Sequence, residues 1–574
     1  MTAAQEKDAL AERVRAWMAE DPDSEDRAEL EMLFAGAENS ERDRRELADR
    51  FADRLHFGTA GLRGAIAAGP NRMNRAVVRS TTAALCRWLA AHRPEAATAG
   101  VVVCCDARHR SPDLADEATA VLAGAGILVH RMADRQPTPL LAFAVRHLGA
   151  AAGVMITASH NPPADNGYKL YLGDGAQIVP PVDAEIERLI GAPAQLSPVR
   201  LGALDGSLVR HCGPEVARSY VAAVLEQVPG GRRIGRPAKV VYTPLHGVAG
   251  ALCLEVVSAA GYPEPAIVPA QALPDPDFPT VAFPNPEEPG ALDLAFALAR
   301  EEGADLVIAN DPDGDRMAVA VPDSSTEGGW RRLSGDEVGV LLGDFVIART
   351  AGPDRLVAAS IVSSTMLEKI AQAAGVRFVA TLTGFKWIVR APDAVPGGRF
   401  IFGYEEALGY AVNTVVRDKD GVSAALAFLD LFRQLEERGS SVLERLDELS
   451  ALHGVHLTRQ LSVRSGDPVS LMASLRADPP EAIAGEELVG VLDLSQGAVW
   501  QPGLPPLPPA DVLCYKLASG SRLIVRPSGT EAKLKSYLEV LAPTSAGLAE
   551  ARLQCGAEMS RLEQAAWQLL GGER

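Results

Sequence analysis

The sequence lacks the features that would place the protein in a membrane or outside the cell. No stretch approaches the roughly 20 consecutive apolar residues of a membrane-spanning helix. The N-terminal residues MTAAQEKDALAERVRAW are charged and helical in pattern, without the apolar core and cleavage site of a signal peptide. The seven cysteines are odd in number and show no CxxC spacing, and Cys104 and Cys105 continue an apolar strand. We therefore expect reduced core cysteines and a cytoplasmic protein.

An excess of positive charge is also missing. The chain has 74 acidic and 56 basic residues, which gives a net charge of −18. This balance argues against a nucleic acid or an anionic membrane as a partner. An anionic substrate would be repelled by the protein as a whole, so any phosphate site must be a local basic pocket. The apolar fraction of 47% and the charged fraction of 23% are those of a soluble globular protein.

The order of helical and extended patterns predicts an α/β fold. Helices and short apolar strands alternate through most of the chain, and three units share one plan in which a strand ends in a polar loop. The last part, with short strands and one closing helix, is typical of a smaller α+β domain. A length of 574 residues suits about four domains. We divide the chain into an N-terminal helical extension and four domains, at 1–55, 56–213, 214–324, 325–452 and 453–574.

Two segments interrupt this plan. A stretch near 191–214 is richer in proline and glycine, which predicts a linker. Residues 263–290 hold nine prolines and show little periodicity. Because proline fixes φ and removes a backbone donor, we predict an extended connection over the surface there.

One serine is fixed at the end of a predicted strand. Val154–Thr157 is β-branched and apolar, and the turn formers that follow include a pair of prolines. Ser159 therefore sits in a stiff loop, with His160 and Lys169 nearby in sequence. Such a serine suits a covalent phosphoryl carrier. The alternative is an ordinary turn whose hydroxyl bonds its own backbone.

Three aspartates alternate on a loop that follows another predicted strand, at Asp311, Asp313 and Asp315. Their spacing turns three carboxylates toward one point, which a hard cation such as Mg²⁺ would make tolerable. An EF-hand is excluded, because Arg316 and Pro322 stand where its loop requires glycine and glutamate. Two alternatives remain. One is an acidic surface turn, and the other is a DxDG loop like that of the haloacid-dehalogenase phosphatases, with Asp311 as nucleophile.

The sequence RPSGTEAK, from Arg526 to Lys533, combines a guanidinium, two hydroxyls and an ammonium. A guanidinium binds phosphate oxygens bidentately, and hydroxyls and backbone N–H groups complete such a site. We interpret the segment as a phosphate cradle built by these two cations and by Ser528, Gly529 and Thr530. An ordinary turn is the alternative.

Two shorter signals are weaker alone. FGTAGLRG at 57–64 has three glycines, which allow close backbone approach to a ligand, and Arg63 supplies a permanent cation. Glu405 and Glu406 form a carboxylate pair in a loop that glycines bound. Carboxylates accept hydrogen bonds from vicinal sugar hydroxyls. The pair could equally suit the dipole of a helix N-terminus.

Taken together, five loops resemble one known superfamily. They are FGTAGLRG at 57–64, TASHNP at 157–162, DPDGDR at 311–316, GYEEALG at 403–409 and RPSGTEAK at 526–533. Their order and spacing resemble the α-D-phosphohexomutases over nearly the whole chain, from about residue 50 onward. GYEEALG, TLTGFKWI and RDKDG are most similar to the branch that holds bacterial phosphoglucomutases and phosphopentomutase-like proteins.

The resemblance implies three similar α/β domains with mixed sheets and a smaller C-terminal α+β domain, around a central cleft that receives one loop from each domain. It also implies that Ser159 carries the phosphoryl group. Mg²⁺ would be held by Asp311, Asp313, Asp315 and the phosphate on Ser159. The substrate-binding residues would be Arg316, Thr383, Gly384, Glu405, Glu406, Arg526, Ser528, Gly529, Thr530 and Lys533.

Physical reasoning, independent of the resemblance, adds further catalytic roles. Arg63 would balance the charge of the phosphoserine. Lys169 and Lys386 are candidates for proton transfer, since the pKa of a lysine can fall in a crowded site. We expect His160 to orient the phosphate rather than act as a base, because adjacent side chains usually diverge.

Two residues depart from the pattern of the superfamily. Ala407 stands where other phosphoglucomutases have a serine, so the choice of sugar is open. Ala532 replaces a usual proline and would loosen the phosphate loop slightly.

The function expected from the sequence is interconversion of glucose 1-phosphate and glucose 6-phosphate, through a phosphoserine and with glucose 1,6-bisphosphate as intermediate and activator. Phosphopentomutase and phosphomannomutase activities are alternatives within the superfamily. A Mg²⁺-dependent sugar phosphatase and a non-catalytic sugar-phosphate binding protein are alternatives from other classes. Both a monomer and a dimer fit the sequence.

Overall fold

The structure, a computed structural model, describes residues 3–191, 196–227, 238–464, 467–527 and 533–572. The chain forms two compact units. The first holds residues 1–230, 237–330 and 415–426, and the second holds the remainder. Each unit is described by itself. Among the described residues, no helix combines the length and the apolar character that crossing a membrane requires.

Three helices open the first unit, as the charge pattern of the sequence predicted. They are α1 (Ala3–Glu20), α2 (Ser24–Gly36) and α3 (Glu41–Arg50). Asp23 caps α2 by accepting a hydrogen bond from the backbone of Glu25, and Ser40 caps α3 in the same way. Trp17 and Phe51 pack edge to face in the small core that the helices enclose.

A mixed six-stranded sheet follows, in the order β1-β5-β4-β2-β3-β6. Its strands are β1 (Leu62–Ala65), β2 (Val101–Cys105), β3 (Val129–Arg131), β4 (Ala152–Ile156), β5 (Asp165–Leu172) and β6 (Val209–His211). The helices beside it are α4 (Arg75–His92), α5 (Ala96–Ala99), α6 (Ser111–Gly124), α7 (Thr138–His147) and α8 (Val182–Leu189). Strands β2, β3, β4 and β6 run parallel, whereas β5 is antiparallel to both β4 and β1. The predicted linker near 191–214 thus supplies β6, an edge strand.

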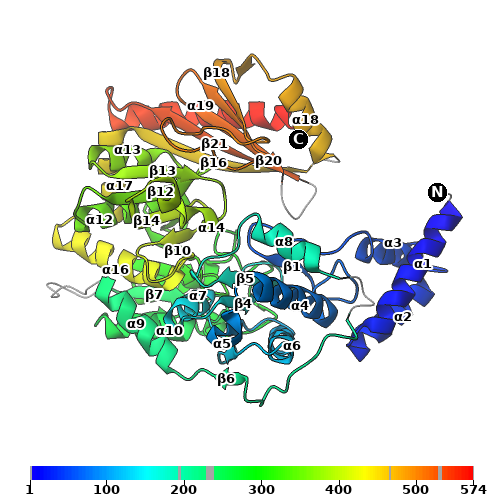
Figure 1. The fold of residues 1–574 in the computed structure, drawn as a ribbon. Coiled ribbons are helices and arrows are strands. Elements are labelled where there is room, and N and C mark those ends of the chain that lie inside the picture. Colours follow the sequence, from blue (N-terminus) through cyan, green and yellow to red (C-terminus); the bar gives the residue numbers. More distant parts are fainter. Residues whose placement is uncertain (1–2, 192–195, 228–237, 465–466, 528–532, 573–574) are drawn as a thin grey trace. The chain divides into compact units, whose positions relative to one another are not determined.

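Helices cover both faces of this sheet (Figure 1). Val101, Val103 and Cys105 point into a core shared with α4 and α6. Gly153 of β4 faces α7, because a Cβ there would overlap Val145 of that helix. Since alternate residues of a strand point to opposite faces, the sheet is buried on both sides.

The second sheet of the first unit has the order β11-β10-β9-β7-β8. Its strands are β7 (Val240–Thr243), β8 (Ala266–Ile267), β9 (Leu306–Asn310), β10 (Met317–Pro322) and β11 (Trp330–Arg332). The helices are α9 (Glu215–Gln227), α10 (Gly250–Ala259), α11 (Asp293–Glu302) and the 3₁₀ turn η2 (Pro269–Gln271). The proline-rich segment 263–290 contains little regular structure, as predicted. However, it is not confined to the surface, because Phe278 within it is buried.

The second unit begins with a mixed four-stranded sheet in the order β13-β12-β14-β15. Its strands are β12 (Arg355–Ser360), β13 (Arg377–Thr381), β14 (Arg399–Glu405) and β15 (Gly409–Ala411). The helices in this part of the chain are α12 (Gly335–Arg349), α13 (Met366–Ala373), α14 (Phe385–Ile388), α15 (Ala391–Ala394), α16 (Gly421–Glu437) and α17 (Val442–His453). Strand β12 is parallel to β13 and β14, and β15 is antiparallel to β14.

The fourth sheet is antiparallel, in the order β16-β21-β20-β19-β18-β17. Its strands are β16 (Val455–Arg464), β17 (Ala482–Ile483), β18 (Glu486–Asp493), β19 (Leu513–Leu517), β20 (Arg522–Pro527) and β21 (Lys533–Ala542). The helices are α18 (Pro468–Ala477) and α19 (Leu548–Leu569), and α19 lies along β16 and β21 (Figure 1). The predicted fold class, three mixed α/β sheets and a C-terminal α+β part, is confirmed.

Candidate active site

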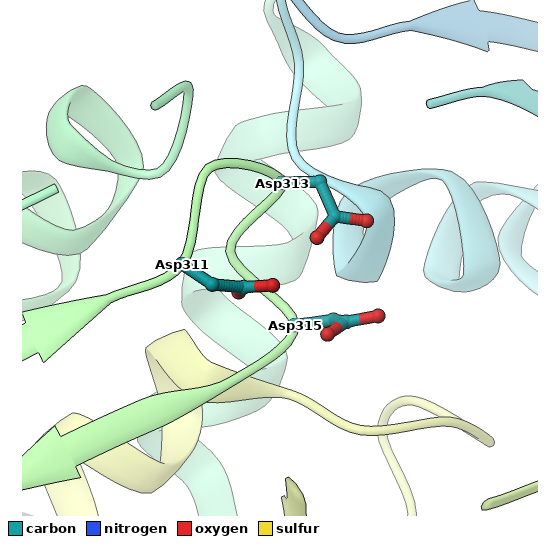
Figure 2. Close-up of side chains that lie close together, drawn as sticks. All are labelled: Asp311, Asp313 and Asp315. Carbon is teal, nitrogen blue, oxygen red and sulfur yellow. The ribbon is translucent and has the colours of Figure 1, made fainter. Parts of the chain in front are cut away.

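Three buried aspartates come together on the loop between β9 and β10. Figure 2 shows the side chains of Asp311, Asp313 and Asp315 gathered on this loop. Their carboxylate oxygens lie within 4.8 Å of one another. The tight turn needs Gly314, whose φ is 73°, and its N–H donates to the carbonyl of Asp311. The clustering predicted from the alternating spacing is confirmed.

The donor set of this cluster fits a divalent cation. Among the described residues, Oδ1 of Asp313 and Oδ1 of Asp315 are buried and have no hydrogen-bond partner. Two buried carboxylate oxygens without a hydrogen bond are costly unless a cation lies close to them, and Nε of Arg316 is 3.8 Å from Oδ1 of Asp315. Burial and the neighbouring Asp315 raise the pKa of Asp313. The cluster can therefore hold a hard cation such as Mg²⁺ through oxygen ligands.

Ser159 lies directly beside the aspartate cluster. It follows β4 and adopts a left-handed backbone with φ of 53°. Its Oγ donates a 2.7 Å hydrogen bond to Oδ2 of Asp311. Nδ1 of His160 lies 3.1 Å from the same Oγ. The expectation that the side chains of Ser159 and His160 diverge is therefore wrong, and the left-handed conformation of Ser159 is the physical reason.

Lys169 reaches the cluster from β5, where it pairs opposite Met155 of β4. Its Nζ donates to Oδ2 of Asp313 at 2.6 Å and to Oδ2 of Asp315 at 2.8 Å. Burial alone would lower the pKa of Lys169, but the two carboxylates outweigh it and raise that pKa. In this structure the pKa of Lys169 thus lies above its ordinary value, and its part in proton transfer stays a prediction. The geometry suits a cation that holds carboxylates in place.

Two arginines stand near the serine and the acids. Arg63 lies on β1, and its guanidinium donates to Oδ1 of Asn161 at 3.0 Å, within the loop of Ser159. Among the described residues, Nε of Arg63 is buried without a partner. The backbone N–H of Arg316 donates to Oδ1 of Asp311 at 2.9 Å. Positive charge thus lies beside three acids, as a phosphate-handling site in an acidic protein requires.

Two other groups at the cluster were not predicted from the sequence. Thr138, at the start of α7, donates from Oγ1 to Oδ2 of Asp313 at 2.6 Å. Lys419 of the RDKDG motif places Nζ 3.2 Å from Oδ2 of Asp315. The RDKDG loop is held by Asp418, which accepts a 2.8 Å hydrogen bond from the hydroxyl of Tyr171. The RDKDG motif was the sequence feature from which a role for Lys419 could have been predicted.

In the second unit, Glu405 and Glu406 end β14 and begin the following turn. Glu405 is buried, and the carboxylate of Glu406 accepts hydrogen bonds from Ser360 Oγ at 3.0 Å and Ser363 Oγ at 3.3 Å. Burial, together with the charges of Glu405 and Asp336, raises the pKa of Glu406 to about 7. The carboxylate of Glu406 is thus held by hydroxyls at the end of β12 and in the loop that follows it.

The remaining candidates of this unit lie at the ends of strands. Arg526 on β20 donates from its guanidinium to the hydroxyl of Tyr537 at 3.1 Å. Lys533 begins β21 and is half-buried. Ser528, Gly529, Thr530 and Ala532 lie outside the described residues.

A turn between β13 and α14 carries three more candidates. Thr383 has a buried Oγ1 without a partner among the described residues, and Gly384 has φ of 112°. Lys386 is half-buried on α14. A backbone with this φ favours glycine, so the local backbone conformation restricts position 384 to glycine.

Comparison with known protein families identifies the first three sheets. The models described as phosphoglucomutase/phosphomannomutase, alpha/beta/alpha domains I, II and III, match residues 54–196, 218–326 and 334–450. A probable phosphomannomutase of Haemophilus influenzae is 40% identical and covers 81% of this chain and 93% of the relative. The phosphopentomutase of Homo sapiens is 36% identical over 93% of this chain and 92% of the relative. A phosphoglucomutase of Staphylococcus epidermidis is 33% identical over 85% and 90%.

Solved structures show the same fold. A putative phosphomannomutase from Thermus thermophilus matches with a TM-score of 0.64 and 24% identity, over 88% of this chain and 99% of its own. The phosphoglucomutase parafusin from Paramecium matches with a TM-score of 0.65 and 17% identity, over 90% and 96%. Taken with the relatives, the fold and the loops define a phosphosugar mutase, an isomerase that transfers a phosphoryl group within its substrate. The chain belongs to the phosphoglucomutase/phosphomannomutase family of the α-D-phosphohexomutase superfamily.

Proposed function

We propose that this protein interconverts glucose 1-phosphate and glucose 6-phosphate through a phosphoserine at Ser159 and glucose 1,6-bisphosphate. The observation that carries the chemistry is the 2.7 Å hydrogen bond between Ser159 Oγ and Asp311. It joins a fixed hydroxyl to a buried carboxylate cluster able to hold a cation. The sugar is the one expected from the loop sequences, and a relative named phosphoglucomutase supports it.

A second candidate substrate is ribose 1-phosphate. Relatives named phosphopentomutase or phosphoribomutase match 92% and 93% of this chain, more than the 85% matched by the phosphoglucomutase relative. Ala407, in place of the serine of other phosphoglucomutases, adjoins the Glu405 and Glu406 pair. The choice between a hexose and a pentose therefore depends on that loop.

In this proposal Asp311, Asp313 and Asp315 hold Mg²⁺ together with the phosphate on Ser159. The bound ion would neutralise charge on the transferring phosphoryl group. The orphaned Oδ1 atoms of Asp313 and Asp315 support the assignment. Lys169 and Lys419 hold the cluster by contacting Oδ2 of the same acids.

Transfer breaks the bond between phosphorus and Ser159 Oγ and forms a bond from phosphorus to the oxygen of a sugar hydroxyl. The sugar hydroxyl gives up its proton, and Ser159 Oγ takes up a proton as it leaves. The transition state is loose, so the protein contributes position and charge. Arg63 and Arg316 balance the phosphoserine, which carries about −1.5 to −2 charge at neutral pH. His160 orients the phosphate from 3.1 Å away from Oγ. Lys386 is our candidate for taking the proton of the sugar hydroxyl.

The second unit supplies the groups proposed to bind the sugar. Glu405 and Glu406 accept hydrogen bonds from sugar hydroxyls. The non-transferring phosphate is bound by Arg526, Ser528, Gly529, Thr530 and Lys533, with Thr383, Gly384 and Arg316 completing the substrate contacts. Each domain of the division at 56–213, 214–324, 325–452 and 453–574 then contributes one functional loop.

The bisphosphate links the two halves of the reaction. After the first transfer it turns around and returns its other phosphoryl group to Ser159. A trace of added sugar bisphosphate acts as an activator, because it phosphorylates any enzyme that has lost its phosphate.

The test is a coupled assay of glucose 1-phosphate, mannose 1-phosphate and ribose 1-phosphate, with and without Mg²⁺ and a trace of sugar bisphosphate. We expect glucose 1-phosphate to give the highest kcat/KM. A higher kcat/KM for ribose 1-phosphate would show that the pentose phosphate, the second candidate, is the preferred substrate. Release of inorganic phosphate as fast as isomerisation would instead indicate a phosphatase.

A further inference from the structure

Ser159 occupies a backbone conformation that its neighbours must maintain. Its φ of 53° lies in the left-handed region, which is unfavourable for a residue other than glycine. On the N-terminal side, the backbone N–H of Ser159 donates to Oγ1 of Thr157 at 2.9 Å. That hydroxyl donates in turn to Oδ2 of Asp106 at 2.7 Å. These bonds fix the start of the loop but do not involve the backbone oxygens of Ser159 and Asn161.

Arg108 accounts for those carbonyl groups. Its guanidinium donates to the backbone oxygens of Ser159 at 2.6 Å and Asn161 at 2.6 Å. It also donates to the backbone oxygens of Pro162 at 2.7 Å and Asp165 at 3.1 Å. One planar fork thus gathers four carbonyls of a proline-stiffened loop, and among them that of Pro162 also accepts from the backbone N–H of Asp165. The side chain is only 1% exposed, so it cannot contact a substrate.

The face of this guanidinium is covered by an aromatic ring from a distant segment. The ring centroid of Phe278 lies 5.1 Å from Cζ of Arg108, within the range of a cation–π interaction. Phe278 belongs to the proline-rich segment 263–290. It is 3% exposed and has φ of 47°, which is unusual for a bulky residue.

The same segment also contacts the support of the aspartate loop. The backbone N–H of Asp275 donates to the carbonyl of His246 at 3.0 Å, and the rings of His246 and Phe278 meet edge to face. Two residues after His246, the N–H of Val248 donates to the carbonyl of Pro312 at 2.8 Å. One segment therefore braces both the loop of Ser159 and the loop of the acids.

We propose that Phe278 and Arg108 are positioning residues that fix the Ser159 hydroxyl against Asp311, so that the proline-rich segment controls phosphoryl transfer from outside the substrate site. This inference rests on the proposed role of Ser159 as phosphoryl carrier. Because both side chains are buried, their loss acts on the transfer step and leaves substrate binding unchanged. Efficient phosphoryl transfer therefore requires both the aromatic ring of Phe278 and the guanidinium group of Arg108.

The experiment compares Phe278→Leu and Phe278→Tyr in the full chain. We expect Phe278→Leu to lower kcat about tenfold, on the scale of a desolvated cation–π contact, with KM within about twofold. Phe278→Tyr keeps the ring and should retain wild-type kcat. Arg108→Lys keeps the charge but loses the fork, and we expect kcat about a hundredfold lower.

Matched controls separate positioning from general loss of stability. Phe51→Leu removes a ring that is 4% exposed in the N-terminal core, far along the chain from either loop. Arg131→Lys alters a buried arginine of β3 that pairs with Asp134 and not with the loop of Ser159. Both should lower the melting temperature and leave kcat unchanged. Equal kcat losses in Phe51→Leu and Phe278→Leu at equal melting temperature would overturn the inference.

Labelling separates failure of this inference from failure of the proposed function. Wild type and variants are incubated with radiolabelled glucose 1,6-bisphosphate, and mass spectrometry locates the label. We expect wild type to be labelled at Ser159 and Phe278→Leu to be labelled more slowly by the same factor as kcat. Labelling of both at one rate would overturn the positioning role alone. A wild type labelled elsewhere, or active after Ser159→Ala, would overturn the proposed function and this inference with it.

Discussion

The Ser159 hydroxyl donates a 2.7 Å hydrogen bond to Asp311, although 152 positions separate the two residues. Ser159 follows β4 of the first sheet, and Asp311 follows β9 of the second. Both belong to the same compact unit of the chain. A candidate nucleophile and a candidate metal site therefore depend on each other, and each can be tested by removing the other.

Removal of the hydroxyl is the most direct test. We expect Ser159→Ala to lower kcat at least about a thousandfold, which is the scale of losing a covalent nucleophile. The variant should also take up no label from sugar bisphosphate. Ser560→Ala, on the exposed face of α19, is the matched control and should behave as wild type. Comparable turnover by Ser159→Ala would end the phosphoserine mechanism.

Removal of the metal ion tests the acid cluster. We expect a chelator to abolish activity and Mg²⁺ to restore it. Mg²⁺ should also raise the melting temperature, because ligand at about 100 times its Kd stabilises a protein by about 2.7 kcal/mol. The ion would satisfy Oδ1 of Asp313 and Asp315. Asp313→Asn should weaken Mg²⁺ binding at least about tenfold in calorimetry, whereas exposed Asp205→Asn should not. Identical Mg²⁺ affinities for the two variants would contradict the assignment.

The loops of the site could be predicted from the sequence because their signals are local. A short apolar run followed by glycine, proline and aspartate marks a strand that ends in a turn. Strand β4 ends one residue before the predicted end at Thr157, and Asp311 directly follows β9, as the predicted order of strand and loop requires. Strand β5 was not predicted. Its pairing with β1 and β4 is non-local, and this pairing is what brings Lys169 to the acids.

The environment of each side chain was harder to predict than its presence. The pKa of Lys169 depends on two carboxylates more than 140 positions away, so its direction could not be read from neighbouring residues. His160 contacts Ser159 because Ser159 adopts a left-handed φ, and the residue types in this loop do not predict that conformation. Arg108 binds backbone carbonyls, and Phe278 packs on the guanidinium face of Arg108. Contacts of these kinds have no characteristic sequence motif.

The carboxylate pair of the second unit is tested by Glu405→Gln. The amide keeps the shape but loses the charged acceptor, and a hydrogen bond to a charged group contributes about 1.5–3 kcal/mol. We expect KM for the sugar phosphate to rise about tenfold or more, with Mg²⁺ affinity unchanged in calorimetry. Glu481→Gln, at an exposed position of the same unit, is the control. An unchanged KM would count against sugar binding by this pair.

A buried ion pair in the second unit makes a stability prediction. Glu539 on β21 accepts hydrogen bonds from Arg522 Nε at 2.7 Å and from the backbone N–H of Thr365 at 2.7 Å. Burial alone would raise the pKa of Glu539, but Arg522 and His456 outweigh it and lower that pKa to about 2. Because the pKa is lower in the folded state than in the unfolded chain, the stabilisation is complete above about pH 4.5. It is lost as the pH falls toward 2.

We therefore expect Glu539→Gln to reduce the free energy of unfolding by about 3 kcal/mol at pH 7, since the substitution leaves Arg522 buried without its partner. Urea unfolding followed by tryptophan fluorescence measures this difference. The difference from wild type should shrink as the pH falls from about 5 toward 3, because Glu539 takes up a proton in the unfolded wild-type chain while the folded carboxylate, with its pKa of about 2, stays ionised. Glu437→Gln removes an exposed ion pair with Arg433 on α16 and should cost less than about 1 kcal/mol at every pH. A pH-independent effect of Glu539→Gln would mean that packing, and not the charge of Glu539, holds the loop after β12 against β21.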